Sequence, residues 1–167
     1  MNIKHINFVV FLDVDGVLNT RTTVQRTPAG YTGIDDARVE ILASAINKIG
    51  GGDIVLSSDW KELEQTHEDF IYLSSKLDRY GLSISGITQD SMHNRGGGII
   101  RYLEAHPEID EYVILDDCNF DFQKYKILWE RLLLTNGIEK AQFAAETPAV
   151  EAILFMDYIK LSTQKCS

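Results

Sequence analysis

Three short apolar runs constrain the fold of this chain more than any other feature of its sequence. They cover residues 6–12, 53–56 and 112–115, and each is almost continuously aliphatic or aromatic before it ends on polar residues. Strands that are buried on both faces of a parallel sheet have such continuous runs, whereas half-exposed strands alternate apolar and polar residues. The runs therefore predict three strands of a parallel sheet.

Stretches with helical periodicity separate these runs. We expect helices over residues 35–49, 60–80 and 98–106, a further strand over 131–135, and a closing helix over 148–160. Alternating strands and helices are typical of an α/β fold with a central parallel sheet and helices on both faces. Because no linker, repeat or shift in composition divides the chain, we expect one three-layer, Rossmann-like domain over residues 1–167.

Residues 16–34, here called the flap, lack any clear period and are rich in Thr, Gly and Arg. They directly follow the first predicted strand, where the loops of an open α/β sheet hold ligands. We expect this segment to cover a site. The intervals between the predicted strands leave no room for a large cap domain, so the site should be open.

Charge and cysteine content exclude several classes of protein. The chain carries 25 acidic and 16 basic residues, a net charge of −9, which disfavours broad nucleic-acid coating and adsorption to anionic membranes. Two cysteines are too few for a disulfide scaffold and indicate a reduced, cytoplasmic protein. The first apolar run is far shorter than the ~20 residues of a spanning helix, so we expect no membrane or export segment.

Polar side chains gather where the predicted strands end: Asp13 and Asp15, then Ser57 and Ser58, then Asp116 and Asp117. The ends of parallel strands meet at one edge of a sheet, so these groups should converge. Four carboxylates in one place repel each other unless a cation lies among them. Oxygen ligands of this kind suit Mg²⁺, which binds one or two protein carboxylates together with a substrate phosphate.

The motifs then become specific. Residues 11–19, Phe-Leu-Asp-Val-Asp-Gly-Val-Leu-Asn, resemble the first motif of the haloacid dehalogenase (HAD) superfamily, whose phosphatase branches read Asp-x-Asp-Gly after a buried strand. Residues 54–57 resemble the second motif and residues 113–117 the acidic fourth motif, which Asp121 continues. Arg95 occupies the place of the basic third motif. The combination is similar to a small cap-less branch that includes domains associated with RNA-repair systems.

The resemblance implies a phosphatase whose residue types fit the chemistry. Asp13 would attack phosphorus and form an aspartyl-phosphate. Asp15 would first protonate the leaving oxygen and then deprotonate water. Ser57 would bind a phosphoryl oxygen, with Ser58 as the adjacent alternative.

For the cation that would bind the phosphate and for the metal ligands, the sequence leaves more than one candidate. Arg95 would offset the phosphate charge, although Lys61 or Arg101 could take its place. For the Mg²⁺ cofactor, the resemblance implies Asp13, the backbone carbonyl of Asp15, and preferably Asp117. Asp116 and Asp121 could be ligands or could support the ligands.

Other residues have ordinary structural interpretations. Cys118 has no histidine partner, so we expect a small buried residue. Trp60 could contact a substrate or pack in the core or against the flap. The four histidines lack the spacing of a zinc site.

The sequence therefore predicts a Mg²⁺-dependent phosphatase whose partner is a phosphorylated small molecule or a nucleic-acid end. One alternative is a phosphoacceptor receiver domain. Receivers have an acidic pair after the first strand and the acceptor Asp after the middle strand, whereas here the middle strand ends in Ser57 and Ser58 and the acidic pair comes later. Another is a catalytically silent relative that serves as a binding module.

Overall fold

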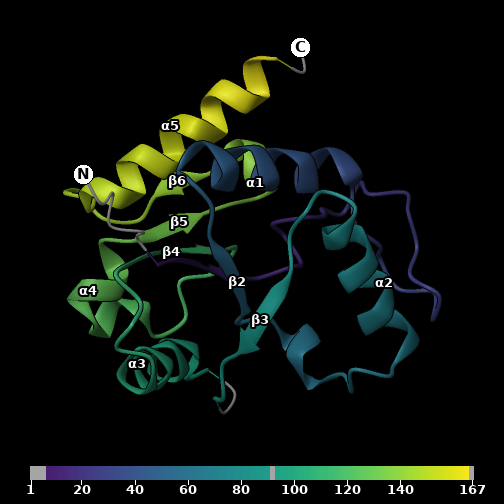
Figure 1. Ribbon diagram of the computed structural model, residues 1–167, viewed down its shortest axis with the longest axis horizontal. Helices are drawn as coiled ribbons and strands as arrows, with labels where there is room; N and C mark the ends of the chain where they lie inside the picture. The colour runs from purple at the N-terminus through teal and green to yellow at the C-terminus, as the bar shows by residue number, and fades with distance from the viewer. Residues whose placement is uncertain (1–6, 91–92, 166–167) are drawn as a thin grey trace, which may run out of the picture.

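A six-stranded sheet forms the centre of the protein in the computed structural model, which describes residues 7–90 and 93–165 (Figure 1). The strand order is β3-β2-β1-β4-β5-β6, with β1 to β5 parallel and β6 antiparallel at the edge. The strands are β1 (Phe8–Leu12), β2 (Asp53–Leu56), β3 (Ile84–Ile87), β4 (Glu111–Asp116), β5 (Leu132–Leu134) and β6 (Gln142–Phe143). The predicted parallel sheet is confirmed.

Helices cover both faces of this sheet. The α-helices are α1 (Asp36–Lys48), α2 (Glu68–Asp78), α3 (Arg95–Ala105), α4 (Lys126–Trp129) and α5 (Val150–Gln164). Three short 3₁₀ helices join them: η1 (Asp59–Glu62), η2 (Phe122–Lys124) and η3 (Ile138–Lys140). In Figure 1, α1 and α5 lie above the sheet, and α3 and α4 lie below it. The three-layer, Rossmann-like α/β architecture without a large cap is therefore confirmed.

Side chains of β1 alternate between two apolar cores. Val10 and Leu12 pack into the core that α1 and α5 close, whereas Val9 and Phe11 pack into the core on the side of α3. All four are almost fully buried. Burial on both faces explains why this strand is apolar at every position.

The strand register brings the candidate site residues to one edge. Leu12 of β1 lies opposite Leu56 of β2 and Leu115 of β4, so the residue after each of them emerges at the same edge of the sheet. The ladder continues one step further, because the Asp13 N–H donates to the Leu115 carbonyl at 2.9 Å. From β1 the chain passes to β2 and β3 on one side, and it then crosses to β4 on the other side of β1. Open α/β sheets bind ligands where the strand order reverses in this way.

Two predicted helices differ in their bounds. The stretch 60–80 is not one helix: η1 ends at Glu62, and α2 begins only at Glu68, where the His67 ring accepts a hydrogen bond from the Asp69 N–H. The helix predicted from Gly98 begins three residues earlier, at Arg95. A distant carboxylate binds the first N–H groups of α3, and local sequence carries no sign of such a contact.

Two short strands were not predicted from the sequence. β3 has four residues, among them Ser85 and Gly86, and β6 has two, so neither forms an apolar run. The start of the first predicted run, at Ile6, lies outside the described residues. No helix within residues 7–90 and 93–165 is both long and apolar enough to cross a bilayer.

Candidate active site

Three carboxylates converge at the edge of the sheet where β1 and β4 end. Asp13, Asp116 and Asp117 each offer an oxygen, and these oxygens lie within 4.8 Å of one another. Asp13 and Asp116 are buried, whereas Asp117 is exposed. The side chain of Asp15, which the sequence also placed here, does not belong to this group. The cluster thus has two buried ligand candidates and one that solvent reaches.

Arg95 is the cation beside these carboxylates. Its Nη1 lies 2.7 Å from Oδ2 of Asp116 and 3.3 Å from Oδ1 of Asp13. The guanidinium also lies over the ring of Phe120, 4.2 Å from the ring centroid, which fixes its plane. Arg95 reaches this position because it is the first residue of α3.

The two other cations that the sequence allowed are engaged elsewhere. Lys61 is buried and forms an ion pair with Asp90, and its Nζ also lies 3.2 Å from Oγ1 of Thr88. Arg101 donates to the backbone carbonyl of Gln89 at 2.7 Å. Neither makes an ion pair with the acidic cluster in the described parts of the chain.

The charges of the cluster do not balance. Burial raises the pKa of Asp13 well above its ordinary value, and the neighbouring charge of Asp116 raises it further, while Arg95 opposes both effects. Burial likewise raises the pKa of Asp116 to about 6, although Arg95 lowers it. One guanidinium faces three carboxylates, so a further positive charge would stabilise their ionised forms. The oxygen-only donor set suits Mg²⁺.

Asp15 is held apart from the cluster by two donors. The side-chain amide of Asn19 donates to its Oδ1 at 2.9 Å, and the indole N–H of Trp60 donates to its Oδ2 at 3.1 Å. Asn19 is itself buried and also donates to the carbonyl of Gly33 in the flap. Sequence reasoning assigned no role to Asn19 and left that of Trp60 open, because both contacts depend on how separate loops meet.

The two adjacent serines have different environments. The hydroxyl of Ser57 is fully buried and has no hydrogen-bond partner within the described residues. The Ser58 hydroxyl instead accepts from the Trp60 N–H at 3.3 Å and caps η1. Buried hydroxyls are nearly always paired, so the orphaned Ser57 Oγ marks a place for a ligand oxygen.

Asp121 supports the site from a distance. Its carboxylate accepts from the N–H of Gly96 at 2.6 Å and from that of Gly97 at 3.2 Å. These are free donors of the first turn of α3, where a negative charge is favourable. Asp121 therefore anchors the helix end that carries Arg95.

Gly16 allows the loop after β1 to pass close to Asp117. Its φ of +81° is in the left-handed region, and a Cβ at this position would meet the Asp117 carboxylate at 2.5 Å. The Gly16 carbonyl is held by the hydroxyl of Thr135 at 2.8 Å. Only glycine fits between these neighbours without moving the acidic cluster.

A cleft of about 1110 Å³ opens beside the cluster, between the flap and η1. We call it the flap cleft. Asp15 and Asp117 lie at its inner end, and its walls include Arg21 and Tyr31 of the flap, Trp60 of η1, and Lys140 of η3. The flap is tied to α2, since Oγ1 of Thr27 donates to Asp69 at 2.9 Å.

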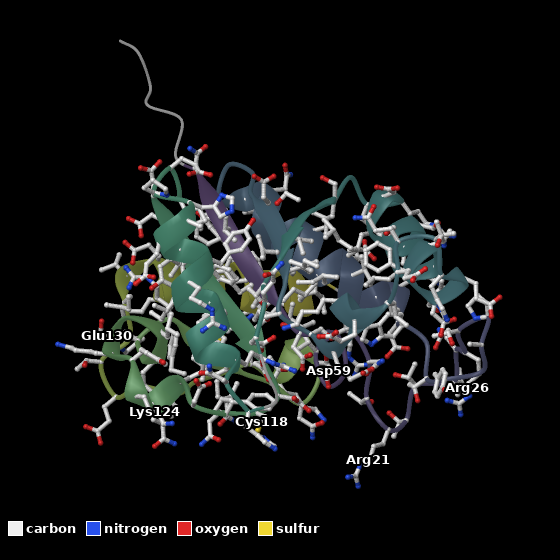
Figure 2. All side chains as sticks on the ribbon, turned by 90° about the horizontal axis from the view of Figure 1, so that it is seen from below. Arg21, Arg26, Asp59, Cys118, Lys124 and Glu130 are labelled. Carbon is white, nitrogen blue, oxygen red and sulfur yellow. The ribbon has the colours of Figure 1, made fainter. Side chains whose placement is uncertain are left out.

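Side chains at the rim of the site project into solvent. Figure 2 shows Arg21, Asp59 and Cys118 along the same face of the molecule. The prediction that Cys118 is buried is wrong, because its side chain is exposed. It follows Asp117 in the loop that leaves the sheet edge, where residues 117–119 are all exposed.

A comparison with protein families decides the affiliation. A family described as the HAD domain in Swiss Army Knife RNA repair proteins matches residues 9–140. The chain belongs to this family. No curated protein matches it.

The matched region of this HAD domain contains every site residue described above. It begins inside β1 and ends with η3, so only β6 and α5 among the regular elements lie beyond it. The family supports a phosphatase-like hydrolase function in general.

Proposed function

We propose that this HAD domain is a Mg²⁺-dependent phosphatase that hydrolyses phosphate monoesters. One observation supports this most directly: the buried carboxylate of Asp13 lies 3.3 Å from Arg95, at the sheet edge where the Ser57 hydroxyl has no hydrogen-bond partner among residues 7–90 and 93–165. A nucleophile, a cation and a free donor thus surround the position that a phosphoryl group would take.

The reaction would proceed in two displacements. In the first, an Asp13 carboxylate oxygen forms a bond to phosphorus as the ester P–O bond breaks, and Asp15 gives its proton to the leaving oxygen. In the second, the oxygen of a water molecule forms a bond to phosphorus as the bond between the Asp13 oxygen and phosphorus breaks, and Asp15 takes a proton from that water. Inorganic phosphate leaves, and Asp13 and Asp15 return to their starting states.

Two further side chains would stabilise the transferring phosphoryl group. The Ser57 hydroxyl would donate to one of its oxygens, which satisfies the buried Oγ. Arg95 would bind another oxygen and offset its charge, as guanidinium groups do with phosphates. Ser58 is assigned to the cap of η1 rather than to the phosphate.

The residues present suit a bound Mg²⁺. Asp13 and Asp117 would be ligands together with the backbone carbonyl of Asp15. Both Asp116 oxygens already accept hydrogen bonds, from Arg95 and from the Cys118 N–H, so Asp116 would orient Arg95 and support the ligands. When bound, the ion supplies positive charge that lets an anionic carboxylate approach an anionic phosphate.

Among the two substrate classes, a nucleic-acid end is favoured over a small phosphate ester. The site has no large cap and opens into the flap cleft, and the family is described from RNA-repair proteins. The net charge of −9 disfavours long contacts along a nucleic acid, so the interaction should be confined to the end of a strand.

Phosphate release from 4-nitrophenyl phosphate tests the proposal. We expect turnover with Mg²⁺, its loss with a chelator, and its loss in Asp13→Asn and Asp15→Asn. Turnover that survives Asp13→Asn would refute the nucleophile. A stable phosphoprotein without turnover would favour a receiver-like role, and neither turnover nor phosphoprotein would favour a silent binding module.

A further inference from the structure

The flap cleft lies on the side of the site where a leaving group would be. Asp15 lines the cleft, whereas Asp13 and Arg95 do not. The two donors that hold the Asp15 carboxylate, Asn19 and Trp60, also line it. A general acid must lie next to the oxygen that it protonates, so the part of the substrate beyond that oxygen would occupy the flap cleft. This step depends on the function proposed above.

Both acids and cations line the cleft. Asp15 and Asp117 belong to the proposed catalytic site, Asp69 accepts hydrogen bonds from the Thr27 hydroxyl and the Ala29 N–H, and Asp59 lies 3.4 Å from Arg95. The cations that remain to meet an anionic leaving group are those of the flap and of η3.

Arg38 lines the cleft but is neutralised, because its guanidinium forms ion pairs with Asp35 and with Glu139. The side chains of Arg21 and Lys140 form no ion pair or hydrogen bond with other side chains in residues 7–90 and 93–165, although Lys140 lies close enough to Glu139 to lower the pKa of that carboxyl. Figure 2 shows Arg21 extending from the flap into solvent. Within those residues Arg21 is thus not neutralised and Lys140 only in part, in a chain whose net charge is −9.

An aromatic ring on the flap adds a second kind of contact. Tyr31 is 71% exposed, although its ring lies in the wall of the cleft. An exposed aromatic face beside cations is the combination on which nucleic-acid bases stack while their phosphates are neutralised. The volume of about 1110 Å³ exceeds what a single small metabolite needs.

We propose that the flap cleft binds the terminal nucleotides of a single nucleic-acid strand whose end phosphate enters the Asp13 site. Tyr31 stacks on a base, and Arg21 and Lys140 pair with the next backbone phosphates. Two cations allow contact with one or two phosphates only, in agreement with a protein that is acidic elsewhere. The cleft would therefore discriminate an oligonucleotide end from a nucleoside monophosphate.

Binding to a catalytically silent protein tests the cleft without turnover. The probe is a fluorescein-labelled hexanucleotide with a phosphate at either its 5′ or its 3′ end, titrated into Asp13→Asn by fluorescence anisotropy. We expect Arg21→Gln and Lys140→Gln each to raise Kd and to lower the slope of log Kd against log salt by about one. Tyr31→Leu should raise Kd about five-fold or more.

Arg26→Gln is the matched control. Arg26 is also an exposed residue of the flap, yet it does not line the cleft, and in Figure 2 it lies away from Arg21. The control should bind as Asp13→Asn alone does. Equal effects of Arg21→Gln and Arg26→Gln would overturn the proposal, because the flap would then act only through its overall charge.

Turnover provides the second arm, in the otherwise unchanged protein. We expect the kcat/KM of a terminally phosphorylated hexanucleotide to exceed that of the matching nucleoside monophosphate by roughly ten-fold or more, since a single phosphate contact contributes on that order. Arg21→Gln should reduce this ratio. A ratio near one, or a higher kcat/KM for a phosphopeptide, would overturn the proposal. Complete absence of phosphate release would instead refute the phosphatase function, and the binding arm would still decide the cleft.

Discussion

The indole N–H of Trp60 donates to the carboxylate of Asp15 at 3.1 Å. This hydrogen bond joins η1, which follows β2, to the loop that follows β1. Together with the Asn19 amide on the other oxygen, it fixes the plane of the carboxylate from two directions. The orientation of the proposed general acid therefore depends on two side chains that do not themselves touch phosphorus.

Trp60→Phe should impair slow substrates more than fast ones. Phenylalanine keeps an aromatic ring, although a smaller one, but lacks the indole N–H, so Asp15 loses one of its two hydrogen-bond donors. We expect kcat to fall roughly ten-fold for alkyl phosphates, whose leaving oxygen needs a proton, and clearly less for 4-nitrophenyl phosphate. Steady-state kinetics on both substrates measures the difference, and Trp129→Phe in α4 is the control. Equal losses on both substrates would contradict an orienting role.

Ser57→Ala and Ser58→Ala should separate activity from stability. The Ser57 hydroxyl has no hydrogen-bond partner in the part of the chain that the structure describes, so its removal should leave Tm unchanged while reducing kcat about 10- to 100-fold, as loss of a donor to the reacting group does. Ser58 caps η1, so Ser58→Ala should cost about 0.5–2 kcal/mol of unfolding free energy. Kinetics and thermal unfolding of both variants test this. A destabilised Ser57→Ala would mean that its hydroxyl has a structural partner.

Asp13→Asn should stabilise the metal-free protein near neutral pH. The pKa values of Asp13 and Asp116 are raised in the folded state, so the folded chain binds more protons than the unfolded chain from the ordinary aspartate pKa up to the raised values, of which that of Asp116 is about 6. The free energy of unfolding of the metal-free protein should therefore fall as the pH rises through this window. Replacing Asp13 by Asn removes one of the two buried carboxyls whose ionisation destabilises the folded chain, and we expect Tm to rise by roughly 2–4 °C.

The same argument predicts where this gain disappears. Below the ordinary pKa of aspartate these carboxyls are protonated in both the folded and the unfolded chain, so Asp13→Asn and the unchanged protein should unfold at similar temperatures. Near neutral pH, Mg²⁺ should raise the Tm of the unchanged protein more than that of Asp13→Asn. A gain in Tm that is independent of pH would contradict the electrostatic cause.

Asp117→Asn and Asp121→Asn should affect the metal differently. Asp117 offers an exposed carboxylate to the acidic cluster, whereas Asp121 binds the N–H groups of Gly96 and Gly97. We expect Asp117→Asn to raise the Kd of Mg²⁺ about ten-fold or more, as loss of a ligand does, and Asp121→Asn to lower Tm with little change in that Kd. Isothermal titration calorimetry with thermal unfolding checks both, and the reverse pattern would make Asp121 the ligand.

The sequence predicts the parallel sheet, three of its central strands and the convergence of the acids, because continuous apolar runs and their polar ends are local patterns. It does not predict that α3 begins at Arg95, since the three following glycines suggest a loop and the stabilising carboxylate of Asp121 comes from far along the chain. It also cannot distinguish Ser57 from Ser58. Only the packing of η1 shows that the Ser58 hydroxyl accepts the hydrogen bond that caps this helix and that the Ser57 hydroxyl does not.

The two parts of the molecule that form the site, β1 and the flap, differ in how well they tolerate amino-acid substitutions. Asp13 extends from β1, whose neighbours β2 and β4 bury it on both edges, while the flap exposes residues such as Val24 and Tyr31. Substitutions at exposed loop positions cost little stability, whereas those of buried residues in a central strand are usually destabilising. Substitutions in the flap can thus change which substrates are bound without disturbing the proposed nucleophile.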